Sequence, residues 1–551
     1  MRRIGRQKRI VVLMMFFFLA TAALGARLFW LQYLHAEEFA RAAVIQRSLR
    51  FVYGTGRGQI LDRDGNSLLD TQRSPVLVSF EPILTEETRQ VLAQNEWDTE
   101  NFVHVFDHID WETANRMQEN PLPGLLVAEQ EQRYGENSLA PHVTGYVQSR
   151  ETLKTRPSYV ELTYRAASGL ERSFDDVLSA ARPSTLAAIV DAHNRLIEPL
   201  GYRHWRDDDP RKPYSVVTTI DSRVQAAAEH VGSTMLQKGA IVVMEPKSGD
   251  ILAMASFPDF KPKEMFTGEM SPSRAAEIDE YNRAIQKYFP GSVFKVILAA
   301  AAIENRVIDV NDSYVCTGSI DVGGENSVSC YNGTVHGEVN FEKALAVSCN
   351  GYFIRLGQLL GRETVTEMAR RFKLGSPTGI PLGSESAGNI PTPEEIPFLG
   401  DLANTSIGQG DVAATPLQLA RLMAIIANDG RDIYPRLVSE ITDSRGSTVK
   451  RYPKLYGSQV ISPSTARRLK PMLTNVVETG TAKAAKSPLY TAAGKSGTAQ
   501  YGPDNEKEHS WFSAYATANG QTYVITVFVE DRPQESPRAA EIFRVLAETL
   551  F

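Results

Sequence analysis

Cysteine is scarce in this sequence, whose 551 residues include three cysteines and nine histidines. No spacing among them matches the paired Cys and His pattern of a zinc site, so no metal is expected. Cys316 and Cys330 flank a glycine-rich loop, and two alternatives stay open for them. Either they form a disulfide that leaves Cys349 alone, or all three cysteines are free thiols.

The sequence also lacks a basic stripe beyond its N-terminus, and its formal net charge is −6. This charge distribution argues against a nucleic-acid partner. No internal repeat is visible. With 42% hydrophobic and 23% charged residues the composition is that of a folded protein, not a disordered one. The length predicts roughly two to four domains.

The sequence has one long apolar run, and a basic segment precedes it. The cations of this segment are Arg2, Arg3, Arg6, Lys8 and Arg9. Residues 10–32 supply the roughly 20 apolar positions of a membrane-spanning anchor if Arg27 extends to the outer interface, where Trp30 and Tyr33 also anchor. By the positive-inside rule, residues 1–9 form a cytoplasmic tail, and the main body of this single-pass protein lies outside the membrane.

A cleaved signal peptide is the alternative, because it shares the basic head and the apolar run. Leu24-Gly-Ala26 offers small residues for such a cleavage. The amphipathic continuation from Tyr33 to Arg47 favours a retained anchor, since it looks like a helix leaving the bilayer.

Two larger units are expected after the anchor, at residues 33–214 and 215–551. The charged, proline-containing stretch Arg206–Pro213 predicts a linker between them. The first unit mixes short strands and helices, and its segment Arg57–Gly65 predicts a strand that enters an Asp-Gly turn.

The second unit begins and ends with strands and has helices between them. Strands are expected at residues 215–220, in a hairpin at 239–255, and at 496–500, 511–518 and 522–529. Helices are expected after Asp221, at 294–303 and at about 537–550. This order predicts an α+β fold in which an antiparallel sheet is flanked by helices and lies beside a helical lobe.

A candidate nucleophile stands in the motif Ser292-Val-Phe-Lys295, directly after Pro290 and Gly291. On a helix that starts here, residues three apart share a face, so Lys295 can reach the Ser292 hydroxyl. An alcohol needs a base to take its proton, and lysine serves as one only when its pKa falls. The apolar neighbours of Lys295 favour such a fall.

A second motif, Lys495-Ser-Gly-Thr498, enters a predicted strand. Lys495 can hold a carboxylate electrostatically, and the hydroxyls of Ser496 and Thr498 can hydrogen-bond to it. Gly497 lets a ligand backbone approach the strand closely. An N–H on this strand, with that of Ser292, can form an oxyanion hole.

A third motif, Ser348-Cys-Asn350, lies between the other two. Ser348 and Asn350 are short polar residues inside an apolar stretch, where buried polar groups need partners. A local cap or loop hydrogen bond explains this motif when it is taken alone, and its position between the other motifs favours a role in the same site.

Two of the patterns occur twice, so residue identity alone is weak evidence. Ser447-Thr-Val-Lys450 lies in a polar, turn-like segment and is expected to be a solvated hairpin. Lys247-Ser-Gly249 lies in the turn of the first hairpin, where turn chemistry explains it. Order and setting separate the candidate motifs from these copies.

With the three motifs in order, the chain resembles the class B penicillin-binding proteins, the monofunctional peptidoglycan D,D-transpeptidases. The stretches Tyr288–Gly291, Ile407–Gly410 and His509–Phe512 are similar to family segments around the motifs. Arg57–Gly65 and Gly169-Leu-Glu171 are similar to the family's N-terminal pedestal. The resemblance implies a pedestal and dimerisation domain at 33–214, a penicillin-binding transpeptidase domain at 215–551, and a single transmembrane helix.

The resemblance also implies a mechanism. Ser292 attacks the penultimate D-alanine carbonyl of a stem peptide, Lys295 accepts the proton, and Ser348 relays it to the departing D-alanine. Asn350 orients substrate and lysine. Lys495, Ser496 and Thr498 hold the terminal carboxylate, a neighbouring amine resolves the acyl-enzyme, and β-lactams acylate the same serine. No cofactor is required, and membrane partners from a division or elongation complex are expected.

Two alternatives belong to other classes. A β-lactamase or carboxypeptidase uses water as acceptor, and Glu385, Glu394 or Glu395 are candidates for a base that activates it. A non-catalytic β-lactam sensor or assembly scaffold is the second alternative. Intact nucleophile and base residues argue against a scaffold, and the long pedestal and the anchor argue against a β-lactamase.

Overall fold

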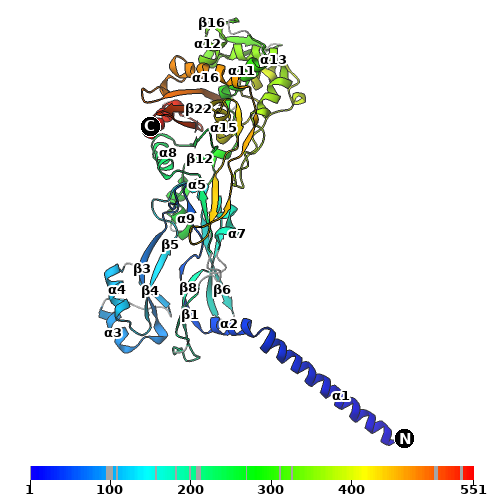
Figure 1. The fold of residues 1–551 in the computed structure, drawn as a ribbon, viewed down its shortest axis with the longest axis vertical. Helices are drawn as coiled ribbons and strands as arrows, with labels where there is room; N and C mark the ends of the chain where they lie inside the picture. Colours follow the sequence, from blue (N-terminus) through cyan, green and yellow to red (C-terminus); the bar gives the residue numbers. More distant parts are fainter. Residues whose placement is uncertain are drawn as a thin grey trace.

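The computed structural model describes residues 2–94, 103–106, 109–155, 158–179, 183–197, 200–205, 212–268, 270–308, 312–323, 327–501, 507–533, 536 and 538–551. The molecule is elongated (Figure 1). A long helix projects from one end, a strand-rich region follows it, and a mixed head at the other end holds the C-terminus. Most of the expected linker Arg206–Pro213 lies outside the described residues.

The N-terminal helix has the length and composition of a membrane span. Helix α1 (Arg2–Phe29) passes through a π-helical turn (Trp30–Leu34) into α2 (Ala36–Gln46), as the amphipathic continuation predicted. The segment Lys8–Leu34 is long and apolar enough to cross a membrane, with a mean hydropathy of 2.1 and 0% of it buried. The Arg27 guanidinium lies 4.7 Å from the centroid of the Trp30 ring.

The strand-rich region between residues 48 and 205, called the pedestal region below, contains several small antiparallel units. One sheet has the order β1-β8-β9 (Ser48–Gly54, Ser184–Ile189, Tyr202–Trp205), and another has the order β4-β3-β5 (Val103–Phe106, Gln72–Phe80, Leu125–Gln132). Strands β6 (Val147–Thr155) and β7 (Ser158–Ala166) form a hairpin. The helices are α3 (Glu86–Gln94), α4 (Trp111–Glu119), α5 (Pro141–Thr144), α6 (Gly169–Ser173) and α7 (Asp175–Leu178).

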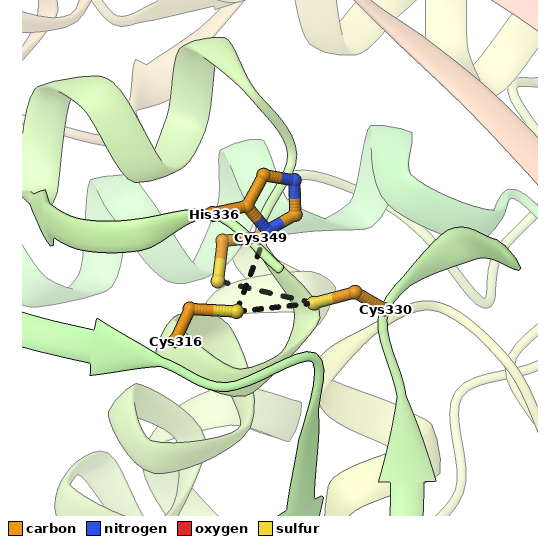
Figure 2. A group of neighbouring side chains, drawn as sticks. All are labelled: Cys316, Cys330, His336 and Cys349. Atoms are coloured by element: carbon orange, nitrogen blue, oxygen red, sulfur yellow. Dashed lines mark hydrogen bonds between the residues drawn. The ribbon is translucent and has the colours of Figure 1, made fainter. Parts of the chain in front are cut away.

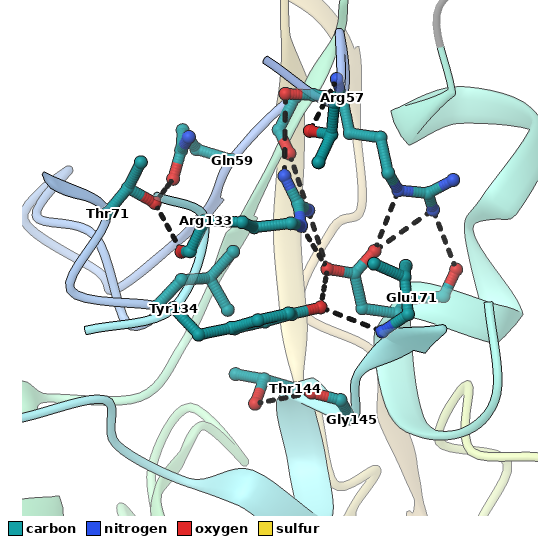
Figure 3. A network of polar contacts seen from close by, with 12 residues as sticks. Arg57, Gln59, Thr71, Arg133, Tyr134, Thr144, Gly145 and Glu171 are labelled. Atoms are coloured by element: carbon teal, nitrogen blue, oxygen red, sulfur yellow. Dashed lines mark hydrogen bonds and ion pairs between the residues drawn. The ribbon is translucent and has the colours of Figure 1, made fainter. Parts of the chain in front are cut away.

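A buried ionic cluster joins three separate segments of the pedestal region (Figure 3). The Glu171 carboxylate of α6 accepts from Arg133 (2.7 Å), from the Tyr134 hydroxyl (2.8 Å) and from Arg57 (3.1 Å). Arg57 also pairs with Asp175 at 2.6 Å. The side chains of Arg57, Arg133 and Glu171 are 2%, 0% and 0% exposed. Because each buried charge has partners of opposite sign, the cluster fixes these segments relative to one another.

The segment Arg57–Gly65 forms the expected strand and turn, but the strand pairs with the head. Strand β2 (Ile60–Leu61) lies parallel to β10 (Ser215–Thr218). The sheet has the order β19-β18-β10-β2, in which β18 is Val438–Thr442 and β19 is Thr448–Arg451. The following turn is closed by the Asp62 carboxylate, which accepts from the backbone N–H of Asn66 at 2.8 Å. A strand from the pedestal region therefore enters a sheet of the head.

The head is built around a five-stranded antiparallel sheet of order β12-β11-β23-β22-β21. Its strands are β11 (Gly239–Met244), β12 (Ile251–Phe257), β21 (Thr491–Tyr501), β22 (Lys507–Ala518) and β23 (Gln521–Val529). The expected hairpin and C-terminal strands are confirmed, and the strand that carries Lys495 is longer than predicted. The head therefore builds its central sheet from strands near its two ends, as the predicted α+β order required.

Helices cover both faces of this sheet. The Phe512 ring of β22 lies 4.8 Å from that of Phe543 in α17 (Ala539–Leu550), which also contacts α8 (Ser222–Met235). The next residue, Ser513, donates to the Leu419 carbonyl of α15 (Pro416–Ala427) at 3.1 Å. Because successive strand residues point to opposite faces, α17 and α15 lie on opposite sides. Pro537, the expected start of the last helix, lies outside the described residues.

The helical lobe lies on the α15 side and holds most of the chain between β12 and β21. It contains α11 (Lys295–Glu304), α12 (Phe341–Ala346), α13 (Asn350–Arg371), α14 (Leu399–Ser406) and α16 (Pro463–Glu478). Shorter helices are α9 (Pro262–Thr267), α10 (Pro272–Glu277), and 3₁₀ turns at Arg283–Ile285 and Gly291–Phe294. Two small hairpins, β13 with β16 (Ser313–Cys316, Gly337–Asn340) and β14 with β15 (Ser319–Asp321, Ser327–Ser329), extend from this lobe.

Candidate active site

Ser292 lies in a tight turn that rests directly on strand β21. The turn is a 3₁₀ helix, Gly291–Phe294, rather than the first turn of an α-helix, and α11 begins at Lys295. Gly291 has φ +53, and a Cβ there would lie 2.7 Å from the Thr498 carbonyl oxygen. A side chain at this position would therefore be strained and would push the turn away from the strand.

The ammonium group of Lys295 is fully buried and joins the Ser292–Lys295 motif to the Ser348–Asn350 motif. Lys295 Nζ donates to Asn350 Oδ1 at 2.6 Å, to the Ser348 carbonyl oxygen at 2.8 Å and to Ser348 Oγ at 3.3 Å. Lys295 is 0% exposed. A buried amine needs hydrogen-bond acceptors, and the Ser348–Asn350 motif supplies all three that are seen.

Ser348 has a backbone conformation that is unusual for serine. Its φ is +60, in the left-handed region, and it forms the bend between α12 and α13. Such a conformation costs of the order of 1–3 kcal/mol for a residue with a side chain. The Asn350 side chain, in the first turn of α13, donates to the Ser329 carbonyl at 2.8 Å. The bend thus directs Ser348 Oγ and Asn350 Oδ1 toward Lys295.

Strand β21 brings the Lys495–Thr498 motif to the Ser348 hydroxyl. Lys495 Nζ donates to Ser348 Oγ at 3.0 Å and to the Ser496 carbonyl at 2.9 Å, and Lys495 is 0% exposed. A Cβ on Gly497 would lie 2.8 Å from the Pro290 carbonyl oxygen and 3.0 Å from Val293 Cγ2. Glycine is therefore what allows this strand to lie against the Ser292 turn.

Burial and charge set the protonation of the two lysines. Burial lowers the pKa of Lys295 to about 8, and the neighbouring Cys349 and Cys330 partly oppose this effect. The pKa of Lys495 is lowered well below its usual value by burial and by the positive charge of Lys295. A lysine with a pKa near neutral can exchange protons with a neighbouring hydroxyl, which suits general-base chemistry.

The structure brings all three predicted motifs into one site. Lys295, Ser348, Asn350 and Lys495 are joined by direct hydrogen bonds. Ser292 adjoins them as the residue one turn before Lys295, and Gly497 and Thr498 adjoin its turn through the close backbone contacts. The Ser496 hydroxyl lies 2.6 Å from that of Thr481, a residue that the sequence did not single out because it belongs to no motif.

The two copies of the patterns lie elsewhere, as predicted. Ser447 precedes strand β19 (Thr448–Arg451), which pairs with β18 (Val438–Thr442) and is exposed at all four positions. Lys247 is an exposed residue of the turn between β11 and β12. Glu385 accepts from the backbone N–H and hydroxyl of Thr378, and Glu395 completes a capping box with Thr392. Both glutamates therefore stabilise local turns.

The cysteines are free thiols, which selects one of the two alternatives for them. Cys316 and Cys330 are buried with their sulfur atoms 3.7 Å apart, and Cys349 is buried close to them. His336, which the sequence analysis did not single out, lies beside Cys316 (Figure 2).

Comparisons with known proteins agree with this fold. The sequence model described as the penicillin binding protein transpeptidase domain matches residues 239–548, and that of the penicillin-binding protein dimerisation domain matches residues 71–204. The peptidoglycan D,D-transpeptidase MrdA of Acinetobacter baumannii is 27% identical and aligns with 96% of this chain and 86% of its own length. MrdA of Haemophilus influenzae is 30% identical over 75% of this chain and 67% of its own.

Solved structures give the same result. A protein in a peptidoglycan synthase complex that coordinates polymerization and crosslinking superposes with a TM-score of 0.72 at 26% identity, over 98% of each chain. PBPA from Mycobacterium tuberculosis superposes with a TM-score of 0.63 at 25% identity, over 90% of this chain and 98% of its own.

Proposed function

Because the chain belongs to the penicillin-binding protein transpeptidase family, we propose that it is a peptidoglycan D,D-transpeptidase that works through an acyl-enzyme on Ser292. The substrate is a stem peptide that ends in D-Ala-D-Ala. The Ser292 hydroxyl attacks the penultimate D-alanine carbonyl, the terminal D-alanine leaves, and an amine of a second stem peptide takes the acyl group. β-Lactams acylate the same serine.

Each residue of the site has a distinct role in this reaction. Lys295 takes the proton of Ser292, and Ser348 passes a proton to the amine of the departing D-alanine. Asn350 keeps Lys295 in place through the 2.6 Å hydrogen bond. Lys495, Ser496 and Thr498 bind the terminal carboxylate, and the N–H groups of Ser292 and Thr498 face the oxyanion, where a donor is worth about 3–4 kcal/mol.

The observation that carries this proposal is the shared hydroxyl of Ser348. Its oxygen lies 3.3 Å from Lys295 Nζ and 3.0 Å from Lys495 Nζ, so one group links the general base to the carboxylate-binding strand. A scaffold protein has no need to bury two amines around one hydroxyl, because burying like charges together is costly.

The location proposed for this reaction is outside the cytoplasmic membrane of a bacterium. The segment Lys8–Leu34 anchors the chain, with the basic N-terminus in the cytoplasm. The proposed boundaries are a tail at 1–9, an anchor at 10–32, a pedestal domain at 33–214 and a transpeptidase domain at 215–551. The pedestal and the anchor bind membrane partners of a division or elongation complex.

A labelling experiment tests the acyl-enzyme. The full chain in detergent is incubated with a fluorescent penicillin beside Ser292→Ala, with Ser447→Ala as a matched serine control. We expect a stable covalent adduct on the wild type and on Ser447→Ala, and none on Ser292→Ala. An unlabelled wild type would support a scaffold, and a label lost within seconds would support a hydrolase.

A further inference from the structure

A hydroxyl that belongs to none of the three motifs contacts the strand proposed to bind the carboxylate. Thr481 Oγ1 lies 2.6 Å from Ser496 Oγ, at the short end of the range for hydrogen bonds between hydroxyls. Thr481 is exposed and Ser496 is half-buried, so a ligand can reach the pair from solvent. Ser496 follows Lys495 on β21. Thr481 is therefore a polar side chain at the edge of the proposed carboxylate site.

The backbone of Thr481 is fixed by contacts with two helices. The preceding residue, Gly480, donates its N–H to the Asn475 carbonyl near the end of α16 at 3.0 Å. The Thr481 N–H donates to the carbonyl of Ala346, the last residue of α12, also at 3.0 Å. A Cβ on Gly480 would overlap that same carbonyl oxygen, so glycine allows the close approach. The Thr481 side chain therefore starts from a defined position.

The same contacts connect Thr481 to the catalytic motifs. Ala346 stands two residues before Ser348, whose hydroxyl accepts from Lys495 Nζ at 3.0 Å. Lys495 Nζ also donates to the Ser496 carbonyl at 2.9 Å. Ser496 is thus held at its carbonyl by Lys495 and at its hydroxyl by Thr481. Contacts at two separate atoms fix both the place and the direction of the Ser496 hydroxyl.

The number of hydrogens decides which of the two hydroxyls donates when a carboxylate is bound. A hydroxyl has one hydrogen and two lone pairs, whereas a carboxylate has only acceptors. If Ser496 gives its hydrogen to the carboxylate, the bond between the two hydroxyls takes its hydrogen from Thr481. A hydroxyl that accepts one hydrogen bond becomes a stronger donor in the next, so this arrangement strengthens the contact with the ligand.

We propose that Thr481 is a positioning residue for recognition of the substrate carboxylate. Its hydroxyl donates to Ser496 Oγ and directs the Ser496 hydrogen toward the terminal carboxylate of the stem peptide, or toward the carboxylate of a β-lactam. This role rests on the proposed acyl transfer at Ser292. Because the carboxylate keeps its charge while Ser292 attacks, Thr481 contributes to ligand binding and little to the chemical step.

Removal of one hydroxyl tests this role. Thr481→Val keeps the shape of the side chain, and its exposed position leaves the core unchanged. Stopped-flow labelling of the full chain in detergent with a fluorescent penicillin measures two constants, the dissociation constant of the first, non-covalent complex and the limiting rate of acylation. We expect the dissociation constant to rise roughly 2- to 10-fold, as for the loss of one neutral hydrogen bond. The limiting rate is expected to stay within about twofold of the wild type.

Two further variants separate the hydroxyl from the packing of the loop. Thr481→Ser keeps the hydroxyl and is expected to bind penicillin like the wild type. Thr479→Val is the matched control, because the Thr479 hydroxyl donates to a carbonyl of its own helix at 3.1 Å, and it is expected to change neither constant. A displaced loop would also move the bend at Ser348. A fall in the limiting rate of Thr481→Val with an unchanged dissociation constant would therefore overturn the positioning role.

A double substitution shows whether Thr481 acts through Ser496. Ser496→Ala removes the group that Thr481 is proposed to orient, so Thr481→Val is expected to have no further effect on the dissociation constant in this background. Equal effects in both backgrounds would overturn the positioning role, since Thr481 would then contact the ligand independently. A wild type that forms no penicillin adduct would overturn the acyl-enzyme itself. Normal labelling with an unchanged dissociation constant in Thr481→Val would overturn only the role of Thr481.

Discussion

The Glu171 carboxylate gives a sharp test of the pedestal region, because Glu171→Gln removes one charge and keeps the shape of the side chain. Arg57 and Arg133 then remain buried with their main anionic partner gone. Removing one partner of a buried ion pair costs about 3–5 kcal/mol, because the remaining charges stay out of water. The same substitution at Glu81 is a matched control, since its pair with Arg89 is 36% and 48% exposed and is worth about 0–1 kcal/mol.

Hydrogen–deuterium exchange measures this effect where it occurs. A loss of 3–5 kcal/mol corresponds to roughly 10²- to 10⁴-fold faster exchange in opening events that expose the cluster. We expect this acceleration in peptides that contain Gly58 and Val147, whose backbone groups bond to Arg133 and Tyr134. Penicillin labelling shows in parallel that the head stays folded. Exchange in Glu171→Gln no faster than in Glu81→Gln would refute the reasoning.

Three further predictions concern the head. Gly497→Ala is expected to abolish penicillin labelling, because the new Cβ would lie 2.8 Å from the Pro290 carbonyl oxygen. The control Gly383→Ala, whose new Cβ would have no atom within 4 Å, is expected to label normally. Equal labelling of both variants would contradict the close contact. The rate of acylation is expected to rise about tenfold per pH unit up to about pH 8 and then to level off. The reason is that neutral Lys295 is the active base and burial lowers its pKa to about 8. A flat pH profile in stopped-flow penicillin labelling would count against this base. Burial raises the pKa of Glu229 to about 7, so the folded state holds this proton more tightly than the unfolded state and stability falls as pH rises from about 4.5 through 7. Glu229→Gln is therefore expected to raise the free energy of unfolding by about 3 kcal/mol at pH 8 and to change it little at pH 4. Equal effects in urea unfolding at both pH values would be inconsistent with this.

The sequence predicted best those elements whose signals are local. The hairpin at 239–255 and the C-terminal strands have apolar, β-branched runs bounded by turn residues, and the helix after Asp221 has its cap. The pairing of Ile60–Leu61 with Ser215–Thr218 was not predictable, because the two strands are about 150 residues apart and belong to different parts of the molecule. No local pattern reports such a pairing.

The active site was predicted in part for the same reason. The spacing of three residues between Ser292 and Lys295 predicted that both belong to one helical turn. The turn is present, but it is a 3₁₀ helix and not an α-helix. That Lys495 meets Ser348 followed only from the order of the motifs and needed the fold to bring them together. The position of His336 beside the buried cysteines was missed because these residues are far apart in the sequence.

The two buried amines have a consequence for ligand binding. Lys295 and Lys495 both approach one hydroxyl, and burial together with the charge of Lys295 lowers the pKa of Lys495. An anion that binds beside Lys495 would favour its charged form, so carboxylate binding and proton uptake are linked processes. The affinity of the site for an anionic ligand should then weaken with rising pH, and the heat of binding should vary with the ionisation enthalpy of the buffer.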